Sequence, residues 1–520
     1  MVAEGTFRKA PGARGVSLLL ISLAYICAGA DWPQFRGLNH DGISTDRILT
    51  NWTGAVTNPV WRVPLTNALS SLVVSGGKVY THAIRTVGGL RREVCVALSE
   101  TNGLELWAAP LDSANYPNGG VGLDDGPRST PVVADGGIFV LTSYLKLYRL
   151  NPANGTVVWQ KDLVSLYGSF VIAWQNAASP LVANGLIYLN ASTSTNSLMA
   201  FRTSDGSLAW RAQNEGLTHD TPILATIHGV PQVIFATAQG VISVDPNNGS
   251  LLWRTNYPFF YSTSIGASPV VWDDVVFVTG ARAYGMGSVA YQVSLSNNVW
   301  TVSRLWWNNT TASHWMTPVC QNGYLYGQFG IFGFDSANAQ LTCVDIRTGL
   351  VKWLMPGFGR AGTVLVNNYL VSLTELGQLV LVKPDTNSYI ELGRFQAILN
   401  YHSDTNKCWN GPAVSDGKIF VRSSAFVAAF DLSVPELKLE PPQFAGPNKL
   451  ALTVGTVNGV PLASNRIAGM EVLAGTNSME NSSQWVKLTN GLTLTNGRVR
   501  IDNVDSGGRP RRYFIVREPD

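Results

Sequence analysis

The chain has 520 residues, of which 45% are hydrophobic and only 14% are charged, with 37 basic against 34 acidic residues. This near balance of charge gives no electrostatic footprint for nucleic acid or for an anionic membrane surface. The 51 glycines and 16 tryptophans are typical of a large, turn-rich β protein and argue against a disordered chain.

The first thirty residues are predicted to be a signal peptide. Three basic residues precede an apolar run at 16–26 that is too short to span a membrane, and small residues at 28–30 form a cleavage site. Cys27 lacks the small preceding residue of a lipidation site, so we expect simple cleavage near Ala30. The mature protein is then exported to the periplasm, the cell surface or the medium, and no later segment is apolar and long enough for a transmembrane helix.

A repeat runs through most of the remaining chain. Each copy begins with Ser/Thr-Pro or a related pair, continues as two apolar runs around a turn, and ends with a strand that carries Trp. Four short strands per copy indicate the blade of a β-propeller. The tryptophans lie 43–53 residues apart and are predicted to be structural, filling the gaps between neighbouring sheets: Trp61, Trp107, Trp159, Trp210, Trp253, Trp306 and Trp353.

The series contains eight copies. The seventh, at 362–392, has Leu392 where the others have Trp, and the eighth, at 411–433, stops after three strands. The missing outer strand is predicted to come from NPVWRVPL at 58–65, because pairing it with the last blade closes the ring and removes exposed sheet edges. We therefore predict an all-β, eight-bladed β-propeller at residues 31–433 that is closed by an N-terminal strand.

Composition changes beyond the ring. Residues 434–444 contain three prolines and are predicted to be a stiff linker. Residues 445–520 alternate as short strands with Asn/Gly turns, which predicts a small β-sandwich-like module.

Four cysteines remain after the predicted cleavage. An exported chain can pair them as two disulfides or keep them as buried thiols, and their spacing does not choose between these alternatives. The sequence has no CxxC, HExxH or Cys/His cluster, so it gives no support for a zinc site. The four are Cys95, Cys320, Cys343 and Cys408.

Three features together resemble a known family. The Trp-bearing repeats, WPQFRG at 32–37 with DGIS at 41–44, and DGPRSTP at 125–131 are similar to the pyrroloquinoline-quinone-like (PQQ-like) repeat propellers of exported bacterial proteins. That family includes quinoprotein dehydrogenases, the propeller subunit of the outer-membrane barrel-assembly machinery, and members without a known activity. The resemblance therefore implies the fold more firmly than the function.

The resemblance also gives WPQFRG an expected place. The motif should lead into the closing strand and fold over one face of the disc, with Trp32 and Phe35 buried against blades and Arg36 paired locally. The alternative for this motif is a contact with a ligand.

A ligand site is expected where the segments leading into the innermost strands converge on the central channel. Arginine forks and indole faces there predict an anionic or planar ligand. The alternative is that Asp220 and the arginines pair with each other and only cap the strands. The predicted ligand-binding residues are Arg128, Asn176, His219, Asp220, His314, Trp315, Arg360, Trp409 and Asn410.

Strong repetition without a catalytic constellation favours a non-catalytic, monomeric binding or scaffold protein. Its expected ligand is a protein, peptide or saccharide at the channel mouth or the disc face, and no cofactor or metal is firmly implied. By resemblance, the alternative is a PQQ- and calcium-dependent dehydrogenase of alcohols or sugars, with Asp220 as a candidate base, although adjacent cysteines and CxxCH are missing. A second alternative by resemblance is outer-membrane protein assembly.

Overall fold

The structure is a computed structural model of the chain. It describes residues 31–116, 125–257, 265–281, 287–330, 339–403, 405–457, 459–462, 464–475, 485–505 and 513–518. The predicted signal peptide at 1–30 lies outside the described residues. The chain divides into two compact units with the boundary between Ser433 and Val434, and each unit is described by itself below.

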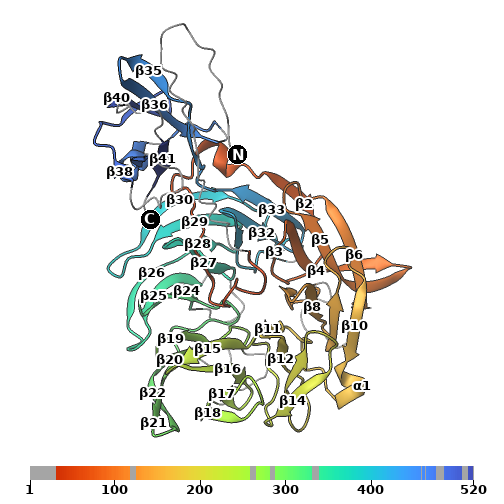
Figure 1. The fold of residues 1–520 in the computed structure, drawn as a ribbon. Coiled ribbons are helices and arrows are strands. Elements are labelled where there is room, and N and C mark those ends of the chain that lie inside the picture. The colour runs from red at the N-terminus through yellow and green to blue at the C-terminus, as the bar shows by residue number, and fades with distance from the viewer. Residues whose placement is uncertain are drawn as a thin grey trace. The chain divides into compact units, whose positions relative to one another are not determined.

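The first unit is a ring of eight sheets, or blades, arranged around a central channel (Figure 1). Each blade has four antiparallel strands, and blade 7 has a fifth strand that pairs parallel. The predicted eight-bladed β-propeller is therefore confirmed. From the channel outward, blades 1 to 4 consist of β3 (Val73–Ser75), β4 (Lys78–Val87), β5 (Leu90–Ser99) and β6 (Glu105–Ser113); β7 (Val132–Ala134), β8 (Gly137–Leu141), β9 (Lys146–Leu150) and β10 (Val157–Asp162); β11 (Leu181–Ala183), β12 (Leu186–Asn190), β13 (Leu198–Arg202) and β14 (Leu208–Ala212); and β15 (Ile223–Ile227), β16 (Val230–Thr237), β17 (Gly240–Val244) and β18 (Leu251–Asn256).

Blades 5 to 8 repeat this order, with two strands added from the N-terminal segment. They consist of β19 (Val270–Trp272), β20 (Val275–Thr279), β21 (Ser288–Ser296) and β22 (Val299–Asn308); β23 (Val319–Gln321), β24 (Tyr324–Phe329), β25 (Gln340–Asp345) and β26 (Val351–Met355); β1 (Ile43–Ser44), β27 (Gly362–Val366), β28 (Tyr369–Leu373), β29 (Gln378–Lys383) and β30 (Ile390–Gln396); and β31 (Ala413–Ser415), β32 (Lys418–Arg422), β33 (Phe426–Asp431) and β2 (Trp61–Pro64). A short helix, α1 (Leu163–Tyr167), follows β10, and a 3-10 helix, η1 (Gly54–Thr57), precedes β2.

The hairpins between the two inner strands follow from local sequence. In blade 2 the turn residues Asp135 and Gly136 have φ of 47° and 66°, and in blade 3 Asn184 and Gly185 have φ of 52° and 76°. Two successive positive φ angles define the type I′ turn, which matches the twist of the strands and which Asn, Asp and Gly tolerate best. Two-residue turns therefore fix the register of the inner strands.

The Ser/Thr-Pro pairs of the repeat join neighbouring blades. In each case the hydroxyl oxygen of a Ser or Thr just before an inner strand accepts a hydrogen bond of 2.9 Å from the backbone N–H of its counterpart in the preceding blade. The donor and acceptor pairs are Ser71 to Thr130, Thr130 to Ser179, Ser179 to Thr221, and Ser268 to Thr317. The motif thus satisfies backbone donors at the inner edges of the sheets, where strand pairing ends.

Glycine replaces the hydroxyl residue in blades 7 and 8. A Cβ on Gly362 would lie only 2.6 Å from the Cα of Gly411, so the two backbones are in direct contact. The inner strands of these two blades approach more closely than a side chain would allow.

The repeated tryptophans lie on the outermost strands, and all except Trp61 lie at a bulge. Most of them donate a hydrogen bond from the indole N–H to a backbone carbonyl in the turn of the next blade, as Trp306 does to Ile346 at 2.8 Å. A glycine with positive φ lies beneath the ring, and a Cβ on Gly349 would come within 2.6 Å of Trp306. Trp253 differs because the next blade has a longer hairpin, and it donates instead to Gln232 Oε1 of its own blade at 2.6 Å. Five of the indoles, those of Trp61, Trp107, Trp159, Trp210 and Trp306, therefore fill an inter-blade gap that a Gly turn leaves open.

The N-terminal segment closes the ring, as predicted. Strand β2 pairs antiparallel with β33 and supplies the fourth strand of blade 8, with Trp61 opposite Ala429. Strand β1 pairs parallel with β27 and adds a fifth, innermost strand to blade 7.

The prediction that Leu392 replaces the blade Trp is wrong. The register of β29 and β30 places Gly393 at the equivalent bulge position, and Leu392 is 39% exposed. The indole that packs there comes from Trp52 of the N-terminal segment, which lies 5.4 Å from the Phe395 ring and within 3.0 Å of a Cβ built on Gly393. Sequence periodicity could not find this substitution because the replacing side chain is about 340 residues away in the chain.

The second unit contains two small sheets, and its strands begin earlier than predicted. One sheet has β34 (Leu437–Leu439), β36 (Lys449–Thr456), β40 (Arg498–Asp505) and β39 (Thr493–Thr495), with β35 (Gln443–Gly446) also paired to β36. The other has β38 (Val486–Lys487), β37 (Glu471–Gly475) and β41 (Tyr513–Arg517), and a 3-10 helix, η5 (Ser464–Gly469), lies between β36 and β37 in sequence. The segment 434–444 is therefore not only a linker, because its prolines flank short edge strands, where a missing N–H is tolerated.

The remaining features of the described residues concern cysteines and the surface. All four described cysteines are free thiols, and burial raises the pKa of Cys320 to about 12 and that of Cys343 to about 11.

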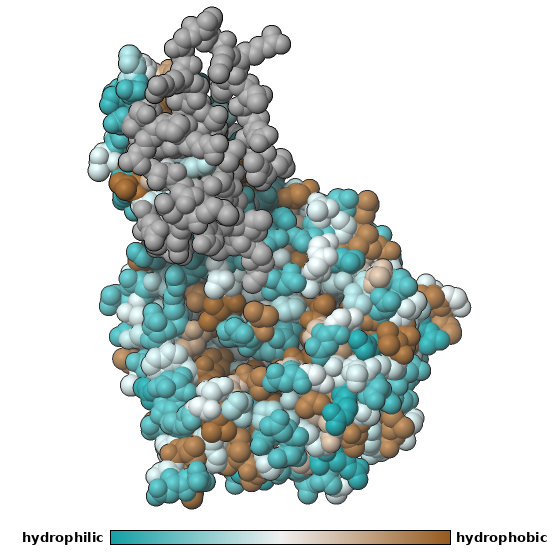
Figure 2. All heavy atoms as spheres, in the orientation of Figure 1, coloured by the Kyte–Doolittle hydropathy of each residue, from teal (hydrophilic) through white to brown (hydrophobic). Residues whose placement is uncertain are grey.

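No helix among the residues described here is long and apolar enough to cross a membrane. Figure 2 shows hydrophobic residues interspersed with hydrophilic ones over the visible face of the propeller.

Candidate functional site

A cavity of about 260 Å³ lies in the central channel, and residues from all eight blades line it. The segments that precede the inner strands supply most of the wall, as expected for a propeller. Seven of the nine predicted ligand-binding residues line this one cavity: Arg128, His219, His314, Trp315, Arg360, Trp409 and Asn410.

The WPQFRG motif forms part of the cavity wall. Trp32 pairs with Val74 of blade 1 through two backbone hydrogen bonds, and the Pro33 carbonyl accepts from the N–H of Val133 in blade 2. The chain then reaches blade 6 through Arg36 and blade 7 through β1, so the segment crosses the channel. Trp32 is buried, Phe35 is half-buried, and both line the cavity. The motif therefore has the predicted structural position and also reaches the candidate site.

Arg36 anchors this crossing. Its guanidinium donates to the carbonyl oxygens of Thr317 at 2.7 Å and Pro318 at 2.8 Å, and to those of His40 and Asp41 within its own segment. Burial lowers the pKa of Arg36 to about 10, so it keeps its charge at neutral pH. Most of its N–H groups already donate to backbone carbonyls. Arg36 therefore holds the segment in place and has little capacity left to bind a ligand.

Blades 6, 7 and 8 build an aromatic and cationic wall. The Trp315 and Trp409 ring centroids are 5.1 Å apart, and the Arg360 guanidinium carbon lies 4.7 Å from the Trp409 centroid and 5.7 Å from that of Trp315. Glu375 holds Arg360 through an ion pair of 3.2 Å and accepts the Trp409 indole N–H at 2.9 Å. Cation–π contacts and the buried ion pair together keep these flat groups in one arrangement.

A second charged group connects blades 2 and 8. Lys407 forms an ion pair with one carboxylate oxygen of Asp125, and Arg128 approaches the other oxygen at 3.5 Å. Lys407 also lies 4.9 Å from the Trp409 centroid. The long Arg128 contact leaves guanidinium N–H groups able to bind a further acceptor.

His219 and Trp174 form the wall at blades 3 and 4. His219 donates from Nε2 to the carbonyl oxygen of Gln175 at 2.8 Å, and Arg128 donates to the carbonyl oxygen of Trp174 at 3.0 Å. Burial and the nearby Arg128 charge lower the pKa of His219 to about 3, so it is neutral at physiological pH. His314 packs on Trp315 with ring centroids 4.7 Å apart.

Two predicted residues lie outside the cavity. Asn176 is buried and donates to the carbonyl oxygen of Ala178 at 3.0 Å, while Asp220 accepts the N–H of Ala236 at 2.9 Å. Burial raises the pKa of Asp220 well above its ordinary value. The alternative in which Asp220 pairs with the arginines is therefore wrong, because Asp125 and Glu375 take that role. Both errors arise because neighbours in the loop face opposite sides of the wall.

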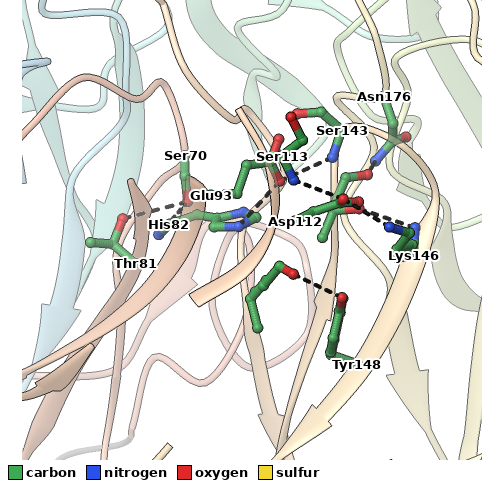
Figure 3. Close-up of polar contacts among 12 residues, drawn as sticks. Ser70, Thr81, His82, Glu93, Asp112, Ser113, Ser143, Lys146, Tyr148 and Asn176 are labelled. Atoms are coloured by element: carbon green, nitrogen blue, oxygen red, sulfur yellow. Dashed lines mark hydrogen bonds and ion pairs between the residues drawn. The ribbon is translucent and has the colours of Figure 1, made fainter. Parts of the chain in front are cut away.

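A buried polar layer lies in blades 1 and 2 (Figure 3). Glu93 accepts from the Tyr116 hydroxyl at 2.8 Å and from the Ser143 N–H at 3.2 Å, and His82 Nε2 lies 3.5 Å away. Burial raises the pKa of Glu93 to about 7. Nearby, Lys146 pairs with Asp112 at 2.9 Å. Sequence reasoning missed this layer because its members lie on different strands without a motif.

The cavity combines positive charge with an unused donor. Among the described lining residues, four are cationic and one, Asp125, is a carboxylate. Asn410 is 6% exposed, and its side-chain Nδ2 has no hydrogen-bond partner among the described residues. A buried donor without a partner indicates a bound water or ligand acceptor. The wall is therefore suited chemically to a compact anion with a flat apolar part.

The sequence missed several cavity residues. Trp174 and Asp125 lie inside segments that sequence analysis placed at the channel mouth, and Lys407 directly precedes another. Residue type would have found them if every charged or aromatic residue of those segments had been considered. Glu375 has no such signal, because it follows β28 and reaches Arg360 only through the fold.

Comparison with known proteins agrees with this architecture. Residues 90–355 match the family described as "Outer membrane protein assembly factor BamB", a PQQ-like repeat family. The chain belongs to this family. Its PQQ-like repeats are the blades described above.

Individual relatives are distant. The assembly factor BamB of Yersinia pestis is 24% identical over 394 residues, which cover 70% of this chain and 88% of that protein. BamB of Moranella endobia (strain PCIT) is 23% identical over 355 residues, covering 66% and 74% respectively. The quinohemoprotein alcohol dehydrogenase of Comamonas testosteroni aligns with a TM-score of 0.52 and 13% identity over 81% of this chain and 83% of that one. The last likeness shows the shared propeller fold alone.

Proposed function

We propose that this PQQ-like propeller is an exported, non-catalytic binding protein whose channel cavity takes a compact anionic ligand with a flat ring. The main support for this proposal is the cavity wall at blades 6 to 8, where Arg360 lies against Trp315 and Trp409. The residues that line the cavity also carry an excess of positive charge. The cavity of about 260 Å³ suits a small molecule or the end group of a larger peptide or saccharide.

The charges favour an anion over a neutral ligand. Arg128 has spare donor capacity, and Asn410 adds an unpaired amide N–H. A ligand carboxylate that accepts from either group forms charge-assisted hydrogen bonds, which are stronger than those of a neutral acceptor. The indoles supply the face against which a ring packs.

Titration with 2-naphthoate tests this proposal, with the neutral analogue 2-naphthylmethanol as the comparison. We expect saturable quenching of tryptophan fluorescence by the anion and at least about tenfold weaker binding of the alcohol, as a lost charge-assisted hydrogen bond predicts. Equal binding of the two, or no saturation by either, would reject an anion site.

Two variants locate the binding in the channel. Arg128→Met keeps the aliphatic stem and leaves Lys407 paired with Asp125, and Trp315→Ala removes a ring face; each is expected to weaken 2-naphthoate binding by about tenfold. The matched controls are Arg202→Met and Trp307→Ala on exposed strand positions, which should leave the affinity unchanged. An equal loss of affinity in the control variants would show that 2-naphthoate binds outside the channel.

The described residues do not fit the calcium of a quinone-dependent dehydrogenase. No group of three or more His, Cys, Asp or Glu side chains that could hold a metal ion occurs in the described part of the chain. Asp125 is occupied by Lys407 and Arg128, and Asp220 lies outside the cavity. Calcium needs six to eight oxygen ligands. Dye reduction after addition of PQQ with calcium would nevertheless favour the dehydrogenase over a binding protein.

A role in outer-membrane protein assembly is the second candidate, and family membership favours it. The relatives from Yersinia pestis and Moranella endobia bear that name. Pull-down of barrel-assembly components from a bacterial envelope extract tests it, with the Arg128→Met and Trp315→Ala variants alongside. Capture that these variants do not change would assign assembly to a surface other than the cavity.

A further inference from the structure

Trp174 has an unusual backbone for its residue type. Trp174 and Gln175 have φ of 67° and 58°, two successive left-handed residues without a glycine. The inner-hairpin turns that use the same conformation are mostly Asn, Asp or Gly, which tolerate it, whereas a bulky side chain in this region is strained. Such strain persists only where the surroundings impose it, and it gathers at ligand-binding positions.

The surroundings that impose this conformation are cavity residues. Arg128 binds the Trp174 carbonyl oxygen at 3.0 Å, and His219 binds the Gln175 carbonyl oxygen at 2.8 Å. Among described non-glycine residues with positive φ, only Arg36 and Trp174 line the cavity. The positive φ of Arg36 has a structural reason, because the Arg36 side chain binds blade 6 and so holds the crossing segment in place. The Trp174 side chain has no comparable structural contact.

The Trp174 side chain lies outside the hydrophobic cores of the described residues. It is half-buried, it belongs to none of the hydrophobic clusters, and its indole makes no hydrogen bond or ring contact with the described residues. The strained backbone thus holds at the cavity wall an aromatic ring that packing does not require. Trp174 also lies opposite Arg360. The segment leading into blade 3 carries Trp174 and the segment leading into blade 7 carries Arg360, and blades four apart in a ring of eight face each other across the channel.

We propose that Trp174 is the residue that selects a flat ligand, by closing the cavity across from Arg360 and its two flanking indoles. This inference rests on the proposed function of the cavity. Arg128 and His219 act as positioning residues, because they hold the loop that presents the ring. A flat aromatic anion fits between facing aromatic and guanidinium groups, whereas a puckered ring of the same carbon skeleton does not.

The test compares 2-naphthoate with decahydro-2-naphthoate, which has the same carbon skeleton but is saturated and puckered. Competition against 2-naphthoate fluorescence measures both affinities. The wild type is expected to prefer the flat acid by about tenfold. Trp174→Phe should keep this preference, and Trp174→Ala should reduce the ratio toward one.

Trp174→Gly separates the ring from the backbone strain. Like the Ala variant it lacks the ring, but Gly adopts positive φ without strain, so its melting temperature should be equal to or above that of the wild type and above that of Trp174→Ala. Weak, unselective binding by a variant of undiminished stability would be the signature of a ligand-selecting residue. A structural residue would instead lose stability in both variants.

The outcomes distinguish the two proposals. If wild type binds neither acid, the proposed function fails and this inference with it. If 2-naphthoate binds and depends on Arg128 and Trp315, but the Gly and Ala variants of Trp174 keep the wild-type ratio, only the role of Trp174 is rejected. A melting temperature of Trp174→Gly well below that of Trp174→Ala would also reject it, because the loop would then not be strained.

Discussion

Replacing Trp61 with Ala should lower the free energy of unfolding of the propeller by about 3–5 kcal/mol, the usual cost of truncating a buried aromatic side chain to Ala. Trp61 is buried on the closing strand β2, where its ring packs 6.1 Å from Phe420 and its indole N–H donates to the Glu100 carbonyl at 2.7 Å. It therefore links blade 8 to blade 1 at the seam of the ring. Denaturant unfolding followed by tryptophan fluorescence and circular dichroism measures the change.

The matched control for the seam is Val60→Ala, one residue earlier in the same segment. Val60 is 53% exposed, so its truncation should change stability by no more than about 0.5 kcal/mol. If Trp61→Ala unfolds at the same denaturant concentration as Val60→Ala, the closing strand does not hold the ring together. An isolated loss in Trp61→Ala would show that seam packing, and not the strand alone, maintains the closed ring.

Replacing Glu93 with Gln should make the protein less sensitive to rising pH. Burial raises the pKa of Glu93 from 4.5 to about 7, so folding takes up a proton in this interval. The corresponding stabilisation is complete below pH 4.5 and is lost as the pH rises through 7, a difference of up to about 3 kcal/mol. Gln has no such proton, and its side-chain oxygen can still accept from Tyr116. The stability of the variant minus that of wild type should therefore rise between pH 5 and pH 8.

The difference between the two proteins isolates this one group. Burial lowers the pKa of His40 and His219 to about 3, and these residues, which do not pair with Glu93, destabilise both proteins equally in acid. His82 lies 3.5 Å from Glu93, but burial lowers its pKa to about 3, below the pH 5–8 range of the comparison. The control is Glu105→Gln, an exposed glutamate paired with Arg85, whose difference from wild type should stay within about 0.5 kcal/mol over the same range. A constant difference for Glu93→Gln across pH 5–8 would mean that Glu93 is already ionised in the folded protein at pH 5.

Much of the fold was predictable because the propeller is built from local repeats. Alternating apolar residues, two-residue turns such as Asp135-Gly136 and the outer-strand tryptophans each act within one blade or between adjacent blades. Closure by the segment around Trp61 was predictable because the last copy of the repeat lacks one strand, while an unpaired strand precedes the first complete copy. The repeats were therefore enough to predict the architecture, because no contact between distant parts of the chain had to be known.

The candidate site was predictable only as a set of loops. Seven predicted residues share the cavity because every loop that enters an inner strand reaches the channel. Which residue of a loop faces the channel depends on backbone angles, and this is why Asn176 and Asp220 turned away while Trp174 turned inward. Residue type and spacing contain no information on that choice.

Short-range patterns that recur along the chain were enough to predict the ring, its eight blades and its closing strand. Three features could be found only in the folded protein: Trp52 fills the place of a missing blade Trp, Glu375 and Asp125 hold the cationic groups, and the WPQFRG segment crosses the channel. These contacts join residues far apart in sequence. Their energies depend on burial and on the mutual orientation of side chains, which exist only once the ring has closed.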